Sequence, residues 1–541
     1  MKKTYYIFDG ISFSPDVSSD DAIADVRKKL KEMGVSLKGC QFDICKKSVD
    51  ARKKDDIKLI WSVAVTGGSF SDKDVRKIER AGARQIVQED LRFERGSEKM
   101  NGRPLVVGMG PAGMFCALIL AEQGYRPIII DRGDSVKDRV FAVEKFYETH
   151  ILDRDSNIQF GAGGAGTFSD GKLLTRINDP KCSYVLDTFV RFGAPDDIKI
   201  KAKPHVGTDV LKNVVDNILS RIKELGGDVI YRCRLTNLRE NSNGSVIAET
   251  TKGVFDASCV VLALGHSARD TYRTLIEKQF DIIAKPISVG VRIEHKRSFI
   301  EEALYGRFAG NPNLGAAEYA LSDTRGERGV YTFCMCPGGE VMAAASEDGG
   351  VVVNGMSHYA RNGENSNSAV AVSINCDDFE AVDGSLPLGA IEFQRKIERA
   401  AFAAGGGGYA VPVQTVGDFL DGRMGTEPSQ VRPTYMNGTN YKTASMDDVL
   451  PNFVCESLRY GLNSFDKKIK GFASDSALLS GAETRTSSPL RILRSENMIA
   501  LGKKSIYPCG EGAGYAGGIT SAAVDGVKTA ISIIERFCPI D

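Results

Sequence analysis

The stretch VVGMGPAGMFCALILAEQGYRPIIIDRG, residues 106–133, contains the pattern that decides the fold. A short apolar strand is followed by glycines at the spacing G-x-G-x-x-G, namely Gly108, Gly110 and Gly113. An apolar helix and a second apolar strand come next, and that strand ends at Asp131. This order is typical of a βαβ unit whose helix N-terminus receives a pyrophosphate. We therefore expect a dinucleotide to bind here.

Each glycine of this unit has its own physical role. Gly108 permits the tight turn, Gly110 lets the backbone approach the pyrophosphate, and Gly113 lets the helix pack closely on the strand. The N–H groups at the start of the helix, around Pro111, are free to bind the phosphates. Asp131 is placed to accept hydrogen bonds from the ribose hydroxyls of the adenosine.

A second stretch, FGAGGAGTFSDGKL at residues 160–173, repeats the same glycine spacing at Gly161, Gly163 and Gly166. The residues before it, ILDRDSNIQ, are mostly polar, and those after it have no apolar helical face. Without a strand and a helix around it, the loop has no helix N-terminus to offer a pyrophosphate. The sequence therefore predicts one dinucleotide-binding unit, not two.

The bulk composition excludes several classes of protein. At 541 residues the chain is too long for one core, so two to four domains are expected. Lys plus Arg and Asp plus Glu both number 70, so no global charge steers the protein toward nucleic acid or membrane. The 12 cysteines lack paired spacing, which favours free thiols, no metal site and a cytoplasmic location. No apolar run is long enough to cross a membrane.

Residues 1–95 form a separate unit by their pattern. Strand-like and helix-like segments alternate in the order βαββαβ, which is that of a ferredoxin-like module. Between its middle strands lies KKSVDARKKDDIK, residues 46–58, with six basic and three acidic side chains. A solvated hairpin is the first interpretation of this run, and a patch that binds nucleic acid is the alternative.

The C-terminal segment YPCGEGAGYAGGITSAAVDG, residues 507–526, resembles the late segment of two-dinucleotide-fold flavoproteins, which returns to the FAD. The resemblance implies that Gly510 and Glu511 meet the ribitol and pyrophosphate. It also implies that Gly517, Gly518 and Ile519 open a helix under the flavin ring. Leu235 matches the position where the backbone meets adenine. FAD is therefore the expected cofactor.

Six motifs together resemble one bacterial family of FAD-dependent dehydrogenases that carry a small N-terminal domain. They are SNIQFGAGGAGTFSDGKL, KPHVGTD, VVLALGHSARDTY, VGVRIEH, CMCPGGEVMAAASEDGGVVVNGMSHYARNGENSNSA and YPCGEGAGYAGGITSAAVDG. They extend over essentially the whole chain. The resemblance implies an α/β, Rossmann-like FAD-binding domain with an inserted α+β substrate domain, preceded by a small α+β ferredoxin-like domain.

The expected boundaries follow from this organisation. Residues 1–95 are the ferredoxin-like domain, and residues 96–284 are the first part of the FAD-binding domain. Residues 285–480 are the inserted substrate or cap domain, and residues 481–541 are the C-terminal return of the FAD-binding domain. In this arrangement the inserted domain covers the face of the flavin.

The expected cofactor-binding residues come from both glycine loops, the strand ends and the C-terminal segment. They are Gly108, Gly110, Pro111, Ala112, Gly113, Asp131, Arg132, Arg139, Gly163, Gly164, Ala165, Gly166, Thr167, Lys172, Leu235, Ala263, Gly265, Gly510, Glu511, Gly517, Gly518 and Ile519. Lys172, His205 and His358 are the catalytic candidates. A cation such as Lys172 near the ring would stabilise the anionic reduced flavin, and the two histidines are acid/base candidates.

The sequence thus favours an FAD-dependent oxidoreductase that passes hydride or electrons between flavin N5 and a small substrate. With one dinucleotide-binding unit, NAD(P)H would visit the substrate cleft only transiently. Two alternatives stay open: a flavoprotein linked to tRNA binding or modification through its N-terminal domain, and a non-catalytic flavin redox sensor. Cys334 and Cys336, two residues apart, are interpreted as structural thiols or as thiols that line the active site.

Overall fold

The computed structural model describes residues 2–89, 91–434 and 440–540. They form two compact units, which are described separately below. The first unit contains Met1–Arg92, Pro195–His205 and Ser298–Ala317. The second contains Phe93–Ala194, Val206–Arg297 and Glu318–Asp541. The described helices include none that is both long and apolar enough to span a membrane.

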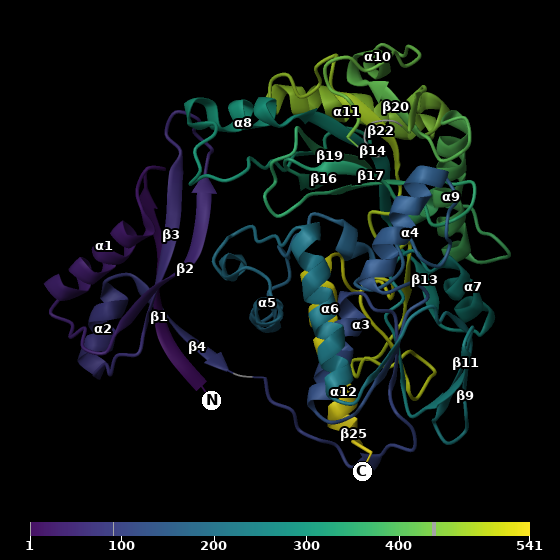
Figure 1. The fold of residues 1–541 in the computed structure, drawn as a ribbon. Coiled ribbons are helices and arrows are strands. Elements are labelled where there is room, and N and C mark those ends of the chain that lie inside the picture. Colours follow the sequence, from purple (N-terminus) through teal and green to yellow (C-terminus); the bar gives the residue numbers. More distant parts are fainter. Residues whose placement is uncertain (1, 90, 435–439, 541) are drawn as a thin grey trace. The chain divides into compact units, whose positions relative to one another are not determined.

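The first unit is built on an antiparallel sheet with the strand order β2-β3-β1-β4. Its elements follow the predicted βαββαβ sequence, and both helices pack against the sheet (Figure 1). They are β1 (Lys2–Phe13), α1 (Ser19–Glu32), β2 (Gln41–Asp50), β3 (Lys58–Thr66), α2 (Asp72–Arg80) and β4 (Ala83–Glu89). Residues 46–58 form the end of β2, a turn and the start of β3, so the predicted hairpin is confirmed.

The first unit extends beyond the expected N-terminal domain because a later segment pairs with its edge strand. The backbone N–H of Lys47 in β2 donates to the carbonyl of Ile200 at 2.6 Å, and the N–H of Ala202 donates to the carbonyl of Lys47 at 2.8 Å. Edge strands leave such backbone groups open for pairing. Residues 200–202 therefore lie along the edge strand β2, although they are about 150 residues away from it in the sequence.

The second unit begins with the predicted dinucleotide fold. Five parallel strands form a sheet in the order β24-β12-β6-β7-β8. They are β6 (Leu105–Val107), β7 (Ile128–Ile130), β8 (Asp228–Ile230), β12 (Val260–Leu262) and β24 (Ile506–Pro508). Every residue of β6, β12 and β24 is buried, which explains their unbroken apolar character.

Helices and a small meander complete this part of the second unit. Helix α3 (Pro111–Glu122) packs against β6, β7, α6 (Thr208–Glu224) and the C-terminal α12 (Ile519–Arg536). Figure 1 shows α3, α6 and α12 running side by side. The meander consists of β9 (Leu235–Glu240), β10 (Val246–Thr250) and β11 (Gly253–Ala257). The remaining helices of this part are α4 (Val136–Thr149), α5 (Lys181–Arg191) and α7 (Arg269–Glu277).

The second glycine stretch lies between α4 and α5, where Gly164–Phe168 form a single short 3-10 helix. No strand leads into it and no long helix leaves it within this described segment. The prediction that this loop is not a second dinucleotide fold is therefore confirmed.

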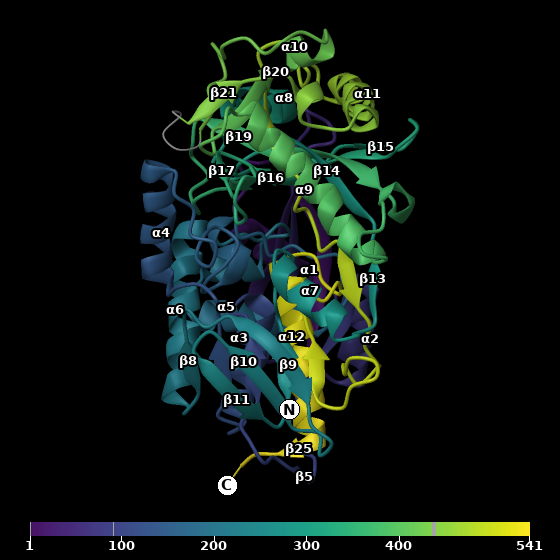
Figure 2. The same ribbon diagram turned by 90° about the vertical axis from the view of Figure 1, so that its right-hand side faces the viewer.

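The rest of the second unit is an α+β region built on a seven-stranded sheet with the order β15-β16-β19-β14-β22-β20-β21. Its strands are β14 (Ile287–Lys296), β15 (Ser322–Asp323), β16 (Val330–Cys336), β19 (Asn365–Ile374), β20 (Val411–Thr415), β21 (Tyr441–Thr443) and β22 (Leu478–Glu483). A hairpin of β17 (Glu340–Ala343) and β18 (Val353–Met356) lies beside it. Helices α9 (Leu386–Ala404) and α11 (Asn452–Lys468) pack on the sheet (Figure 2), and α10 (Val416–Leu420) follows β20.

Two short strand pairs connect segments that are distant in sequence. β13 (Ile282–Ala284) pairs with β23 (Leu490–Ile492), so the chain enters and leaves the α+β region at adjacent strands. β5 (Glu98–Lys99) pairs with β25 (Phe537–Cys538) near the end of the chain. Helix α8 (Arg297–Tyr305) follows β14 directly.

Candidate functional site

A cavity of about 300 Å³ lies at the carboxyl ends of the parallel strands. This is the edge at which open α/β sheets bind ligands. Fifteen of the predicted residues line it: Gly108, Gly110, Pro111, Ala112, Asp131, Gly164, Ala165, Gly166, Lys172, Ala263, Gly265, Glu511, Gly517, Gly518 and Ile519. The chain thus brings the ends of β6, β7, β12 and β24 together with the second glycine stretch and the start of α12.

The three glycines of the first loop differ in the space around them. A Cβ atom on Gly108 would lie 2.1 Å from the carbonyl oxygen of Ala263, and one on Gly113 would lie 1.9 Å from that of Gly108. These two glycines therefore let backbone pack on backbone, and Gly113 does not line the cavity. A Cβ on Gly110 would approach no atom closer than 3.9 Å. Its missing side chain leaves space for a ligand at the N-terminus of α3.

Asp131 follows β7 and is 8% exposed. Its carboxylate accepts hydrogen bonds from the N–H of Met109 at 2.8 Å and from the N–H of Gly133 at 2.9 Å. A carboxylate has about four acceptor positions, so further positions stay available for the hydroxyls of a ribose. Asp131 thus also holds the first glycine loop in place.

Two predicted residues, Arg132 and Leu235, lie in a smaller hollow of about 30 Å³ that shares Gly108, Asp131 and Phe160 with the main cavity. The guanidinium of Arg132 stacks over the ring of Phe160 at 4.3 Å and pairs with Asp270 at 2.7 Å. The hollow adjoins Asp131, so it lies where the expected ribose contact would direct the adenine end of FAD.

Arg139 does not line the cavity, contrary to expectation. It is fully buried, and its guanidinium donates to the carbonyl oxygens of a single turn of chain. These carbonyls belong to Asn157 (2.8 Å), Ile158 (2.8 Å), Gly161 (3.3 Å), Ala162 (2.8 Å) and Gly164 (2.8 Å). Burial lowers the pKa of Arg139 to about 9. The second glycine stretch therefore folds around the guanidinium of Arg139. The hydrogen bonds from Arg139 fix the turn that presents Gly164 to the cavity.

Gly163 and Thr167 are also placed behind the wall, not on it. Gly163 has a φ of 82°, and a Cβ there would lie 1.9 Å from Oγ1 of Thr167. The Thr167 hydroxyl, fully buried, donates to the carbonyl of Ala162 at 3.1 Å. Both residues stabilise the turn that presents Gly164 and its neighbours to the cavity.

The C-terminal return places one acid and one helix end at the cavity. Gly510 packs inward, since a Cβ there would lie 2.6 Å from Cβ of Ala112, and its N–H donates to Asp525 at 2.7 Å. Glu511 lines the cavity, as do Gly517 and Gly518, which directly precede α12. A Cβ on Gly517 or Gly518 would meet no atom within 4 Å. The positive end of α12 is therefore open toward the cavity.

Gly517→Asp is expected to make the flavin midpoint potential more negative by about 10–40 mV, because a carboxylate at this helix end opposes the negative charge of the reduced flavin. Gly517 suits this test because a side chain there has open space, whereas Gly518 has a φ of 130° that would strain one. The potential is measured by dye-coupled reduction. Gly517→Asn is the uncharged control, and equal potentials in the two variants would contradict the placement of the ring near α12.

Glu511 carries a pH dependence that can be measured. Burial raises its pKa from 4.5 to about 7, and the charge of Lys285 only partly opposes this. Between pH 4.5 and about 7, the carboxyl group of Glu511 is therefore protonated in the folded, cofactor-free protein and ionised in the unfolded chain. This contribution to stability is complete below pH 4.5 and is lost as the pH rises to about 7.

The shift corresponds to about 3 kcal/mol. Between pH 4.5 and 7.5, the cofactor-free Glu511→Gln variant should lose less unfolding free energy than the wild type by up to this amount. Urea unfolding at both pH values measures the difference. Glu294, whose pKa burial also raises to about 7, contributes equally to both proteins. Parallel pH profiles for the two proteins would contradict the expectation.

Of the three catalytic candidates, Lys172 alone lines the cavity among the described residues. Burial alone would lower its pKa, but the nearby Cys336, Asp170 and Cys334 raise it, so the lysine is charged. The ring of His358 is 56% exposed, with its Nδ1 4.0 Å from Asp209, and it does not line the cavity. His205 belongs to the first compact unit, whereas the cavity belongs to the second.

Sequence reasoning missed several residues of the cavity wall. They are Gln159, Phe160, His266, Ser267, Phe333, Glu483 and Arg485. Burial lowers the pKa of His266 to about 3, with the charges of Arg485 and Arg269 adding to this effect, so its ring is neutral. The dipeptide His266-Ser267 stands in the quoted motif VVLALGHSARDTY, directly after β12, and that position at a strand end was a usable signal.

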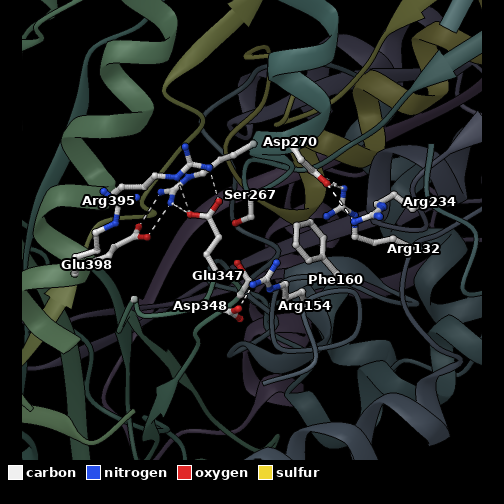
Figure 3. Close-up of a pocket in the computed structure, with 14 residues that line it drawn as sticks. Arg132, Arg154, Phe160, Arg234, Ser267, Asp270, Glu347, Asp348, Arg395 and Glu398 are labelled. Carbon is white, nitrogen blue, oxygen red and sulfur yellow. Dashed lines mark hydrogen bonds and ion pairs between the residues drawn. The ribbon is translucent and has the colours of Figure 1, made fainter. Parts of the chain in front are cut away.

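A second pocket of about 350 Å³ adjoins the cavity, with Phe160 and Ser267 lining both. Figure 3 shows its arginine and acidic side chains pointing toward one another. Glu398 pairs with Arg269 at 2.8 Å and with Arg485 at 3.0 Å. This ion-pair network holds the guanidinium of Arg485 at the cavity wall.

The cavity fits FAD on three observations. The first glycine loop offers open backbone at a helix N-terminus, Asp131 has spare acceptor positions, and a second helix end is open at the far side. These are the groups that a pyrophosphate, a ribose and a reducible ring require. Groups of His, Cys, Asp or Glu that could hold a metal ion are absent from the described residues.

Comparison with known proteins agrees with this geometry. The family model described as "FAD-dependent protein, C-terminal domain-like" matches residues 286–486. A protein of Clostridium beijerinckii, itself called uncharacterized, is 46% identical over 532 residues, which cover 96% of this chain and 98% of that protein. FixC of Salmonella typhi is 27% identical over 217 residues, which cover 39% of this chain and 47% of FixC.

Two solved structures show weaker likeness. CtdE in complex with FAD has a TM-score of 0.32 and 12% identity, covering 80% of this chain and 84% of CtdE. L-amino acid deaminase from Proteus vulgaris has a TM-score of 0.33 and 13% identity, covering 84% of this chain and 98% of the deaminase.

The fold, the cavity and the family match define an FAD-dependent flavoprotein. The chain belongs to the family that includes the Clostridium beijerinckii protein, and its cofactor is FAD. This is the family whose motifs the sequence resembles.

Proposed function

We propose that the protein is an FAD-dependent oxidoreductase that passes hydride or electrons between flavin N5 and a small substrate. One observation carries the proposal: residues of the α+β region wall the same cavity as the FAD-binding loops. Phe333, Cys334 and Asn354 come from β16 and β18, and Glu483 and Arg485 come from the end of β22 and the turn after it. A substrate held by these side chains would lie beside the cofactor.

The side chains of the cavity support this chemistry. FAD, when bound, supplies two-electron transfer. Lys172 and the N-terminus of α12 place positive charge at the cavity, which favours the anionic reduced form of the ring. Arg485, held by Glu398, can orient an anionic group of a substrate. Neutral His266 can donate one hydrogen bond and accept another at its ring nitrogens, which would orient a polar group of a substrate.

Anaerobic mixing of the FAD-loaded protein with candidate reductants tests the proposal. We expect a small substrate to bleach the flavin absorbance rapidly, and NADH or NADPH to bleach it slowly or not at all. Arg485→Met should raise the substrate concentration needed for half-maximal bleaching and leave FAD bound. If photochemical reduction works but no substrate class bleaches the flavin, the proposed catalytic role is wrong and a redox sensor is favoured.

A further inference from the structure

Cys334 and Cys336 lie at a break in strand β16. The pairing of β16 with β19 shifts register between Phe333 and Cys336, and Cys334 has a φ of 46° in the left-handed region. Because of this break, the two cysteines do not share one face of a regular strand. Cys334 lines the flavin cavity, while Cys336 is fully buried behind it.

The break brings the two thiols within reach of each other. The Cys336 thiol donates to the carbonyl of Cys334 at 3.3 Å, so the buried sulfur points back along the chain. Cα atoms two residues apart are separated by at most about 7 Å, and a kinked backbone shortens this. Disulfides need Cα atoms about 4.4–6.8 Å apart.

Two cations surround the pair. Lys172 donates to the carbonyl of Met335, the residue between the cysteines. The guanidinium of Arg292 donates to the carbonyl of Cys334 at 3.2 Å and lies 3.9 Å from the sulfur of Cys336. Positive charge at a thiol favours the thiolate, which is the reactive nucleophile.

The two thiols differ in acidity. The hydrogen bond with the Cys336 thiol and the charges of Lys172 and Arg292, which together outweigh burial, hold the pKa of Cys334 well below its usual range. The same hydrogen bond and burial raise the pKa of Cys336. The thiol with the lowered pKa is therefore the one that lines the cavity.

We propose that Cys334 and Cys336 form a redox-active dithiol that exchanges two electrons with the flavin, which makes disulfides and dithiols the substrate class of this site. The inference rests on the proposed function, because it needs the flavin ring in this cavity.

The exchange consists of two half-reactions, one between the substrate and the two cysteines and one between the cysteines and the flavin. The Cys334 thiolate attacks one sulfur of a substrate disulfide, forming a mixed disulfide and releasing the first substrate thiolate. Cys336 then loses its proton and attacks Cys334 Sγ, which releases the second substrate thiolate and closes the Cys334–Cys336 disulfide. Two electrons from the reduced flavin, with two protons, return this disulfide to the dithiol. The flavin receives these electrons from a dithiol substrate, which reduces the Cys334–Cys336 disulfide by the reverse exchange and is itself oxidised to a disulfide, after which the Cys334–Cys336 dithiol passes two electrons to FAD.

Anaerobic dithionite titration of the oxidised, FAD-loaded protein tests the inference without a substrate. We expect the wild type to take up four electrons per FAD, two for the flavin and two for the disulfide. Cys336→Ser should take up two. Cys376→Ser, which changes a free cysteine that does not line the cavity, is the matched control and should take up four.

Alkylation after mild oxidation and unfolding gives a second measurement on the unaltered protein. Mass spectrometry should find the peptide with Cys334 and Cys336 unalkylated and two mass units lighter than the same peptide with two free thiols. The buried Cys455 should be alkylated. Uptake of two electrons together with full alkylation of both residues overturns the inference. That result would not contradict the proposed oxidoreductase function. The proposed function is contradicted only if no substrate of any class bleaches the flavin.

Discussion

Gly110→Val is expected to abolish FAD binding while the cofactor-free protein keeps its fold. Gly110 has φ −74° and ψ 179°, which valine adopts without strain. The nearest protein atom to an added Cβ is 3.9 Å away, so the protein accommodates the side chain. The branched methyl groups then occupy the space that the pyrophosphate needs. We expect at least about a 100-fold loss of affinity, roughly 3 kcal/mol.

FAD titration followed by flavin fluorescence measures the affinity, and circular dichroism measures the fold. Gly113→Val is the contrasting variant, because its Cβ would lie 1.9 Å from the carbonyl oxygen of Gly108. That variant should lower the thermal midpoint of the cofactor-free protein as well. A yellow Gly110→Val protein with wild-type affinity would show that the pyrophosphate does not approach this glycine.

Arg139→Met is expected to destabilise the cofactor-free protein by roughly 3–5 kcal/mol. Methionine fills much of the volume but donates no hydrogen bond. The carbonyl oxygens that Arg139 now satisfies, from Asn157 to Gly164, would lose their donors in a buried site. Because the turn that carries these carbonyls presents Gly164 to the cavity, FAD affinity should fall with stability.

Urea unfolding measures this effect. Arg154→Met serves as the control, since the side chain of Arg154 is 67% exposed and pairs with Asp348 at the surface. An exposed ion pair contributes about 0–1 kcal/mol, so the control should change little. Equal losses in the two variants would contradict the role given to Arg139.

The parts of the site that the sequence predicted are those encoded in short, contiguous segments. A strand, three glycines, a helix and an acid occur within residues 106–133, and their spacing fixes the geometry. The cofactor residues of the C-terminal return were predicted by resemblance, and four of these five residues line the cavity. The positions of Gly110 and Asp131 at the cavity could therefore be predicted from the order and spacing of residues alone.

The parts that the sequence did not predict depend on contacts between distant segments. Arg139 was assigned to the cofactor, but it lies in α4 and binds carbonyls 18 to 25 residues later. Backbone carbonyls have no signature in a sequence, so this contact could not be foreseen. Arg485 and Phe333 reach the cavity only because the seven-stranded sheet brings β16 and β22 there.

The pairing of β13 with β23 has a consequence for how such proteins diversify. Residues 282–284 and 490–492 are antiparallel neighbours, so the chain between them departs and returns at almost one point. The intervening 200 or so residues therefore form an insertion whose two ends lie side by side. A shorter or different insertion could replace it without changing the sheet of five parallel strands. Under the proposed function, exchanging this region would change the substrate-binding side chains and keep the FAD-binding sheet.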